Sequence, residues 1–230
     1  MHQVIYHGSR IMVERPAFGV GNPHNDYGLG FYCTSELDLA KEWACTEENS
    51  GFANQYEFDL SGLSLLRLSS GDFHLLNWLA LLLNNRKFRV SNDVAGEGRE
   101  YLLSHYLPDA SRFDVIIGYQ ANDSYFSFAN AFLNGVLSLE QLGVAMRLGA
   151  LGEQIVLKSK VSFERIRFVG SEIADKYVYY PRKNARDKEA RAAYKRERST
   201  QRTLEAVYIL DILRERWKKD DPRIPRNISR

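Results

Sequence analysis

Two short glycine-containing stretches constrain the fold of this chain more than any other feature. Residues 3–6 (QVIY) have the β-branched and aromatic content of a strand, which ends at His7, Gly8 and Ser9. A loop rich in Gly and Pro then leads to residues 28–34 (GLGFYCT), which enter a second strand through two glycines and two aromatic rings. This pattern predicts an imidazole and aromatic rings beside bare backbone, as one wall of a nucleotide pocket.

The bulk composition indicates an ordinary soluble protein. The chain has 230 residues with 44% apolar and 26% charged residues, which fits one large domain or one domain with an appendage. Its most apolar run, residues 75–83, contains Asn77 and is much shorter than a membrane-spanning helix. The N-terminus has no signal-peptide pattern, and Cys33 and Cys45 form no CxxC motif. We therefore expect a cytoplasmic protein with reduced thiols, no metal site and no membrane contact.

The charge is distributed unevenly along the chain. Residues 182–219 carry thirteen Lys and Arg against six Asp and Glu, whereas residues 1–181 have a net charge of −6. This asymmetry predicts an anionic partner for the basic segment, which could be nucleic acid, an acidic protein or the body of the same chain. If the partner is nucleic acid, Tyr194 is a candidate for base stacking. Alternatively, the segment is a solvated helix whose apolar stripe packs on the body.

The order of the predicted elements indicates an α+β fold, because strands and helices follow one another without a regular βαβ alternation. Besides the two strands at the N-terminus, we expect strands near residues 54–60, 63–68, 114–119, 154–159 and 163–170. We expect helices near residues 36–46, 72–83, 96–106, 124–135 and 139–148. Residues 182–219 contain no Gly or Pro and predict one long helix or two. These patterns divide the chain into a domain of residues 1–181 and a basic helical extension of residues 182–230.

Four motifs follow one another in this chain. They are YHGS at 6–9, DYGLGFYCT at 26–34, DVIIG at 114–118 followed by ANDSY at 121–125, and EQIVLKS at 153–159. Together they resemble DUF3990, a family of uncharacterised bacterial proteins that looks like a branch of the ADP-ribosyltransferase superfamily. The resemblance covers roughly residues 3–170. It implies an ADP-ribosyltransferase-like split β-sandwich with flanking helices around an NAD cleft.

The resemblance also implies roles for single residues. His7 would contact the adenosine-side ribose of NAD, and Tyr32 would stack on nicotinamide. A Glu at the head of a later strand would hold the nicotinamide ribose, but this chain has Gln154 at that position, preceded by Glu153. An amide can bond to a ribose hydroxyl but carries no negative charge. Three alternatives stay open: Glu153 turns into the site, Asp123 supplies the carboxylate, or catalysis uses Gln154 itself.

Strand geometry bears on the choice between Glu153 and Gln154. Adjacent side chains of a strand face opposite ways, so only one of the two can face the cleft. Ile155 shares the face of Glu153, whereas Lys158 shares the face of Gln154. The Lys158 side is the more open of the two, which favours Gln154.

The remaining candidates lie near the glycine-containing stretches. Cleavage of the bond between nicotinamide and ribose passes through an oxocarbenium, so the site must fix the ribose and stabilise positive charge. Gly8 would let the cofactor approach the backbone closely. Ser9 and Thr34 could bond to the cofactor or merely close their turns. Tyr27 could stack on the cofactor or line the loop.

The resemblance therefore implies an NAD-dependent ADP-ribosyltransferase that uses NAD as substrate and needs no metal. A bacterial toxin of a toxin–antitoxin pair would fit this activity, with a protein or nucleic acid as acceptor. RNA or DNA could bind through residues 182–219, and an antitoxin or regulatory protein could be a further partner. Two alternatives are a catalytically silent module that binds NAD or nucleic acid, and an NAD glycohydrolase. The acceptor would be set by the loop near residues 145–152, which shows no pattern that identifies it.

Overall fold

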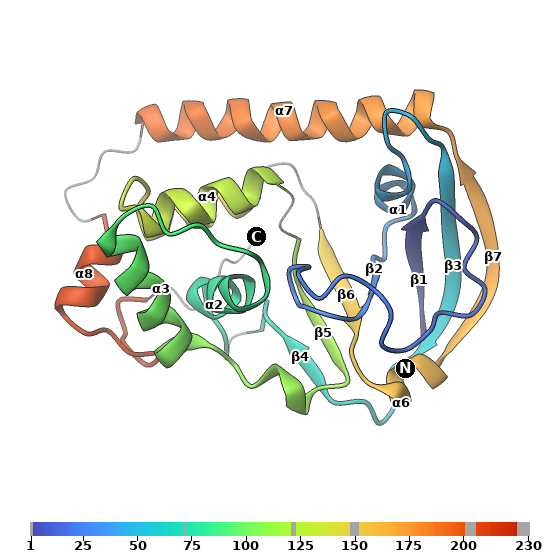
Figure 1. The fold of residues 1–230 in the computed structure, drawn as a ribbon, viewed down its shortest axis with the longest axis horizontal. Helices are drawn as coiled ribbons and strands as arrows, with labels where there is room; N and C mark the ends of the chain where they lie inside the picture. The colour runs from blue at the N-terminus through green and yellow to red at the C-terminus, as the bar shows by residue number, and fades with distance from the viewer. Residues whose placement is uncertain (1, 71, 121–122, 148–151, 201–205, 225–230) are drawn as a thin grey trace.

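The computed structural model describes residues 2–70, 72–120, 123–147, 152–200 and 206–224. The fold is α+β with two sheets, as the sequence predicts (Figure 1). One sheet has the order β1-β3-β7 and is built from β1 (His2–Ser9), β3 (Gly51–Asp59) and β7 (Ile166–Ala174). The other has the order β2-β6-β5-β4 and is built from β2 (Phe31–Cys33), β6 (Glu153–Leu157), β5 (Val115–Tyr119) and β4 (Leu65–Arg67). Strands β4 and β5 pair in parallel, and the other pairs are antiparallel.

Helices pack against both sheets. In chain order they are α1 (Leu37–Ala44), α2 (Leu75–Asn85), α3 (Asp93–Tyr106), α4 (Asp123–Leu133), α5 (Leu139–Arg147), α6 (Lys160–Glu164), α7 (Lys176–Thr200) and α8 (Ile209–Arg214), with a 3₁₀ turn at Ala110–Arg112. The long helix α7 runs along one side of the molecule, from α1 and β7 at one end to α4 at the other (Figure 1). Among the described helices, none combines the length and the apolar composition needed to cross a membrane.

The four-stranded sheet separates two hydrophobic cores. On β6, Ile155 and Leu157 face a layer between the two sheets, while Val156 faces the helices on the other side. This confirms the alternation expected from the sequence. The layer between the sheets contains Ile5, Phe31, Cys33, Tyr56, Phe58, Leu60, Val115, Ile117, Ile155 and Leu157.

The two sheets are joined where β1 passes the end of β2. The backbone of Tyr6 exchanges two hydrogen bonds with that of Thr34, at 2.8 and 2.9 Å. The fully buried Asn54 of β3 fixes the same corner, because its Nδ2 donates to the carbonyl of His7 at 3.0 Å and its Oδ1 accepts from the amide of Val13 at 2.9 Å. The end of β1 is therefore held against β2 and β3 at once.

The strand predicted over residues 163–170 is wrong in its first part. Residues Lys160–Glu164 form the short helix α6, and β7 begins only at Ile166. The side chain of Ser159 caps α6 by accepting from the amide of Ser162 at 3.1 Å. Ser and Thr hydroxyls favour such helix starts, and this local bond takes precedence over the strand tendency of the following residues.

The C-terminal region is integrated into the body more closely than a basic extension would be. Helix α7 begins at Lys176 and contains Pro181, so the expected boundary after residue 181 falls inside a helix. The segment that follows contributes buried side chains to the helical core, namely Ile209, Ile212, Trp217 and Ile224.

Helix α7 is bound to the body partly by charge. Arg186 lies 2.7 Å from Glu42 of α1, whose side chain is only 3% exposed. Arg182 lies 3.5 Å from the exposed Asp38 of α1. The ring of Tyr194 is partly buried and packs on that of Phe128, with ring centres 4.4 Å apart, so this tyrosine contributes to the packing of α7 on the body. At these positions the acidic partner of the basic segment is the same chain.

Candidate functional site

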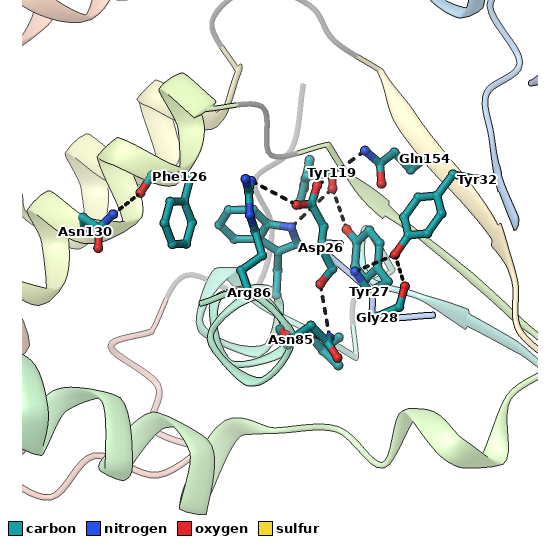
Figure 2. A network of polar contacts seen from close by, with 12 residues as sticks. Asp26, Tyr27, Gly28, Tyr32, Asn85, Arg86, Tyr119, Phe126, Asn130 and Gln154 are labelled. Atoms are coloured by element: carbon teal, nitrogen blue, oxygen red, sulfur yellow. Dashed lines mark hydrogen bonds and ion pairs between the residues drawn. The ribbon is translucent and has the colours of Figure 1, made fainter. Parts of the chain in front are cut away.

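A cavity of about 420 Å³ lies at the edge of the four-stranded sheet. Its lining comes from the loop before β2, from β2 and β6, from the end of β5, and from α1 and the end of α2. The lining residues are Asn25, Asp26, Tyr32, Trp43, Arg86, Gln120 and Gln154. Two of these residues, Tyr32 and Gln154, are among those that the sequence predicts for the site. Figure 2 shows how Asp26, Arg86, Gln154 and Tyr32 converge.

The side chain of Gln154, and not that of Glu153, lines this cavity. Gln154 is 7% exposed, and its Nε2 donates to Asp26 Oδ2 at 3.4 Å. Glu153 has the opposite direction on β6, and its Oε2 lies 3.7 Å from Nη1 of Arg67. Of the two candidates, the amide of Gln154 is therefore the one that lies next to the cavity.

The ring of Tyr32 is fixed by hydrogen bonds at its hydroxyl. This hydroxyl donates to the carbonyl of Gly28 at 2.6 Å and accepts from the amide of Tyr27 at 3.1 Å (Figure 2). Tyr27 itself is 2% exposed, and its hydroxyl donates to the carbonyl of Tyr119 at 2.5 Å. Burial raises the pKa of both tyrosines, so both are neutral at physiological pH. Tyr27 is thus a core residue beneath the site, and the structure leaves no open face of its ring for stacking.

The loop that carries Asp26 is held from two sides. Nζ of Lys158 donates to the carbonyls of Tyr27, at 2.6 Å, and of Leu29. Nδ2 of Asn85 donates to the carbonyl of Asp26 at 3.2 Å. Between them, Gly28 has a φ of +73°, a conformation that strongly favours glycine. The loop conformation therefore depends on a residue just after β6 and a residue of α2, both distant in the sequence.

A buried ion pair lies inside the cavity. Asp26 is 6% exposed, and its Oδ1 lies 3.3 Å from Nη1 of Arg86. The guanidinium of Arg86 also lies over the ring of Phe126, 4.6 Å from its centre. Neither member of the pair is among the site residues predicted from the sequence. Asp26 is the first residue of the DYGLGFYCT motif and could have been singled out there, whereas no sequence signal marks Arg86.

Three lining residues have a buried polar atom without a hydrogen-bond partner in the described part of the structure. These atoms are Oε1 of Gln154, Oε1 of Gln120 and Nε1 of Trp43. A buried polar group left unpaired costs about 1–3 kcal/mol. A bound ligand or ordered water would remove that cost. The concentration of such atoms around one cavity is what a polar ligand site requires.

His7 lies outside the lining of this cavity, next to the strand that carries Tyr32. Its Nδ1 donates to the carbonyl of Tyr32 at 2.7 Å, and its ring centre is 4.3 Å from that of Phe31. Burial lowers the pKa of His7, so the imidazole is neutral at pH 7 and its Nε2 is a hydrogen-bond acceptor.

Three other predicted residues have structural roles that account for their identity. A Cβ on Gly8 would lie 2.0 Å from the carbonyl oxygen of Ala40, so glycine is needed for α1 to pack on β1. Oγ of Ser9 donates to the carbonyl of Ile11 at 2.7 Å, and the fully buried Thr34 accepts from the amide of Glu36 at 3.2 Å. For Ser9 and Thr34 the bonds favour the turn-closing alternative.

Other predictions fall on parts that are not described. Helix α4 begins at Asp123, but the side chain of Asp123 lies outside the described residues. Residues 148–151, in the loop expected to set the acceptor, also lie outside them. Among the described residues, no three His, Cys, Asp or Glu side chains come together as metal ligands would.

A second cavity, of about 540 Å³, lies where the start of α2 meets the end of α3, and His74, His105 and Lys219 are among its lining residues. It is the larger of the two. None of the site residues predicted from the sequence lines it. The smaller cavity is therefore the candidate site, because the predicted residues and the unpaired polar atoms coincide there.

Comparison with known families agrees with the motifs. Residues 3–168 match the family described as protein of unknown function (DUF3990). The chain belongs to DUF3990. The matched range includes all seven residues that line the candidate cavity. No curated protein and no solved structure matches the chain.

Proposed function

We propose that this DUF3990 protein is an NAD-dependent ADP-ribosyltransferase with an ADP-ribosyltransferase-like split β-sandwich. One observation carries the proposal: Tyr32 of β2 and Gln154 of the neighbouring β6 line the same cavity. These are the two positions to which the motifs assign the nicotinamide ring and its ribose. A cavity of about 420 Å³ also lies within the usual range for ligand pockets, roughly 300–1,000 Å³.

The lining of the cavity suits the nicotinamide half of NAD. Tyr32 and Trp43 provide aromatic surface for a flat heterocycle. The amides of Gln120 and Gln154 have buried oxygens without partners, and a carboxamide or ribose hydroxyl can donate to them. The neutral His7, with Nε2 as acceptor, would then hold the adenosine-side ribose from the β1 side of Tyr32.

We propose a macromolecule as acceptor and a toxin-like role in the cytoplasm. The two cysteines, Cys33 and Cys45, are free and buried, which suits a reducing compartment. Nucleic acid would bind along the exposed side of α7, where Lys188, Arg191 and Lys195 follow one another at helical spacing. An antitoxin or regulatory protein would complete such a system.

Labelled NAD tests the proposal directly. The protein is incubated with adenylate-labelled NAD and cell lysate, and nicotinamide release, labelled protein and labelled nucleic acid are measured. We expect release and a labelled product that either protease or nuclease removes. An intact fold with no nicotinamide release and no labelled protein or nucleic acid would overturn the proposal.

Variants at Tyr32 separate stacking from folding. Tyr32→Ala removes the ring, so we expect NAD affinity to fall at least tenfold. Tyr32→Phe keeps the ring but removes the bonds to Gly28 and Tyr27, so we expect a smaller loss of affinity together with a small loss of stability. Tyr177→Ala serves as control, because Tyr177 is 80% exposed on α7 and is not among the residues that line the cavity.

A silent NAD-binding module is the second candidate, and the neutral amide of Gln154 favours it. Such a module would bind NAD by calorimetry and release no nicotinamide, and Gln154→Glu would then gain turnover. A glycohydrolase would release both nicotinamide and free ADP-ribose without labelling any macromolecule. Product analysis therefore separates all three activities.

A further inference from the structure

We propose that Asp26 is the catalytic carboxylate of this cavity, supplying the negative charge that Gln154 lacks. The inference rests on the proposed cleavage of NAD and names the residue that would stabilise its transition state. Asp26 and Gln154 come from segments 128 residues apart, and a hydrogen bond joins them at 3.4 Å inside the cavity.

Asp26 is the acidic residue among those that line the cavity, and it is 6% exposed. Glu153, the alternative on β6, lies on the other face of the strand beside Arg67. A ribose bound at the amide of Gln154 would therefore have the Asp26 carboxylate as its nearest described negative charge.

The fold also holds Asp26 in place. Its backbone carbonyl accepts from Asn85, and the next residues are bound by Lys158 through the carbonyls of Tyr27 and Leu29. Its carboxylate is balanced by Arg86 at 3.3 Å. A carboxylate that is fixed before the reaction needs little reorganisation as positive charge develops. Arg86 is thus a positioning residue in this assignment.

The bond between C1′ of the ribose and the nicotinamide nitrogen breaks, and both bonding electrons go to the nitrogen, so nicotinamide leaves as a neutral molecule. C1′ becomes part of an oxocarbenium, which the Asp26 carboxylate stabilises by charge while Gln154 bonds to a ribose hydroxyl. An oxygen or nitrogen of the acceptor then bonds to C1′ and releases its proton to solvent.

The test compares two substitutions that each replace a carboxylate by an amide of the same shape. Asp26→Asn removes the charge in the cavity, and Glu153→Gln removes a charge on the opposite face of β6, outside the cavity. We measure kcat for nicotinamide release, the Kd for NAD by calorimetry, and unfolding by urea. We expect Asp26→Asn to lower kcat by about 10²–10³-fold, with a much smaller change in Kd, as for removal of one electrostatic stabiliser. We expect Glu153→Gln to leave kcat within about threefold.

Asp26→Asn leaves Arg86 without its counter-charge and could impair folding. The double variant Asp26→Asn with Arg86→Met removes both charges together and is the second test, with Arg86→Met alone as its reference. We expect kcat of the double variant to be lower than that of Arg86→Met by about tenfold or more. Equal kcat in these two variants would contradict the assignment.

The outcomes separate this inference from the proposed function. If the wild-type protein releases nicotinamide and folded Asp26→Asn keeps its kcat, the role of Asp26 is overturned and the transferase proposal stands. If the wild-type protein releases no nicotinamide, both are overturned. A loss confined to Asp26→Asn, with Glu153→Gln unaffected, supports Asp26.

Discussion

The corner at the end of β1 and the cavity beside β6 both contain polar residues, but the hydrogen bonds of these residues differ. At the corner, Nδ1 of His7, the hydroxyl of Ser9 and the amide of Asn54 all bond to groups of the protein itself. At the cavity, Gln154 and Trp43 each keep a buried polar atom without a partner in the described structure. The first region is built to hold two sheets together. The second region keeps buried polar atoms that could form hydrogen bonds with a ligand.

This difference changes the meaning of the N-terminal motif. Gly8 and Ser9 resemble cofactor-binding residues in the sequence, yet their contacts explain them by packing and turn closure. Tyr32 belongs to both regions, since its backbone carbonyl binds His7 and its ring lines the cavity. The comparison can be tested at each position by measuring stability and ligand binding separately.

The largest expected effect is at Gly8. The Cβ of Gly8→Ala would meet backbone of α1 at 2.0 Å, and backbone cannot move aside as a flexible side chain can. We expect a loss of about 3 kcal/mol or more in the free energy of unfolding, measured by urea denaturation. Gly143→Ala is the matched control, because the added Cβ meets nothing within 4 Å and lies in α5. There we expect a gain of up to about 1 kcal/mol.

Asn54 provides the next test of the corner. Asn54→Ala leaves the amide of Val13 and the carbonyl of His7 without their buried partner. We expect a loss of about 1–3 kcal/mol in the free energy of unfolding. Asn84→Ala, at an exposed position of α2, should change it by less than about 0.5 kcal/mol. Equal losses in the two variants would show that the corner is not a stabilising network.

Gln154 should show the opposite behaviour to Asn54. Gln154→Met has nearly the same shape. It removes a polar oxygen that has no partner, but also the long bond from Nε2 to Asp26, so we expect the free energy of unfolding to change by less than about 1 kcal/mol. We expect NAD affinity to fall about tenfold, measured by calorimetry. A clear loss of stability without loss of binding would contradict the distinction between the two regions.

The smallest expected effect concerns the pH dependence contributed by His7. Burial lowers the pKa of His7 in the folded protein below its usual 6.5, so the unfolded chain binds a proton more readily. Stability should therefore fall as the pH drops from 7 through the unfolded pKa towards the folded one, and level off below it. His7→Gln should reduce this dependence in urea denaturation at pH 5 to 7. The same change at the exposed His24 is the control.

Local patterns allowed part of this structure to be predicted from the sequence. The period of two along residues 153–157 was sufficient to place Gln154 and Val156 on one face of β6. Helix and strand positions followed from apolar spacing and capping residues, with α6 and the start of α7 as exceptions. The α+β class followed from the order of these elements.

The contents of the cavity could not be predicted in the same way. Asp26 reaches the cavity because two distant residues hold its loop. Lys158 bonds to Tyr27, 131 residues away, and Asn85 bonds to Asp26, 59 residues away. Arg86 lies just beyond the end of α2, where the sequence shows only a basic stretch. Likewise, composition reveals an excess of positive charge in α7 but cannot show that Arg186 pairs with Glu42. Such pairs depend on tertiary contacts.

The course of β7 and α7 has a consequence for how the molecule could be divided. The family match ends at residue 168, within β7, which continues pairing with β3 as far as Ala174. A fragment cut there would lose the part of β7 that faces residues 51–55, and Glu42 would be left buried without Arg186. The segment that the family model matches is therefore shorter than the folded unit of this chain, and residues beyond 168 complete the strand pairing of β3 and the charge pairing of α1.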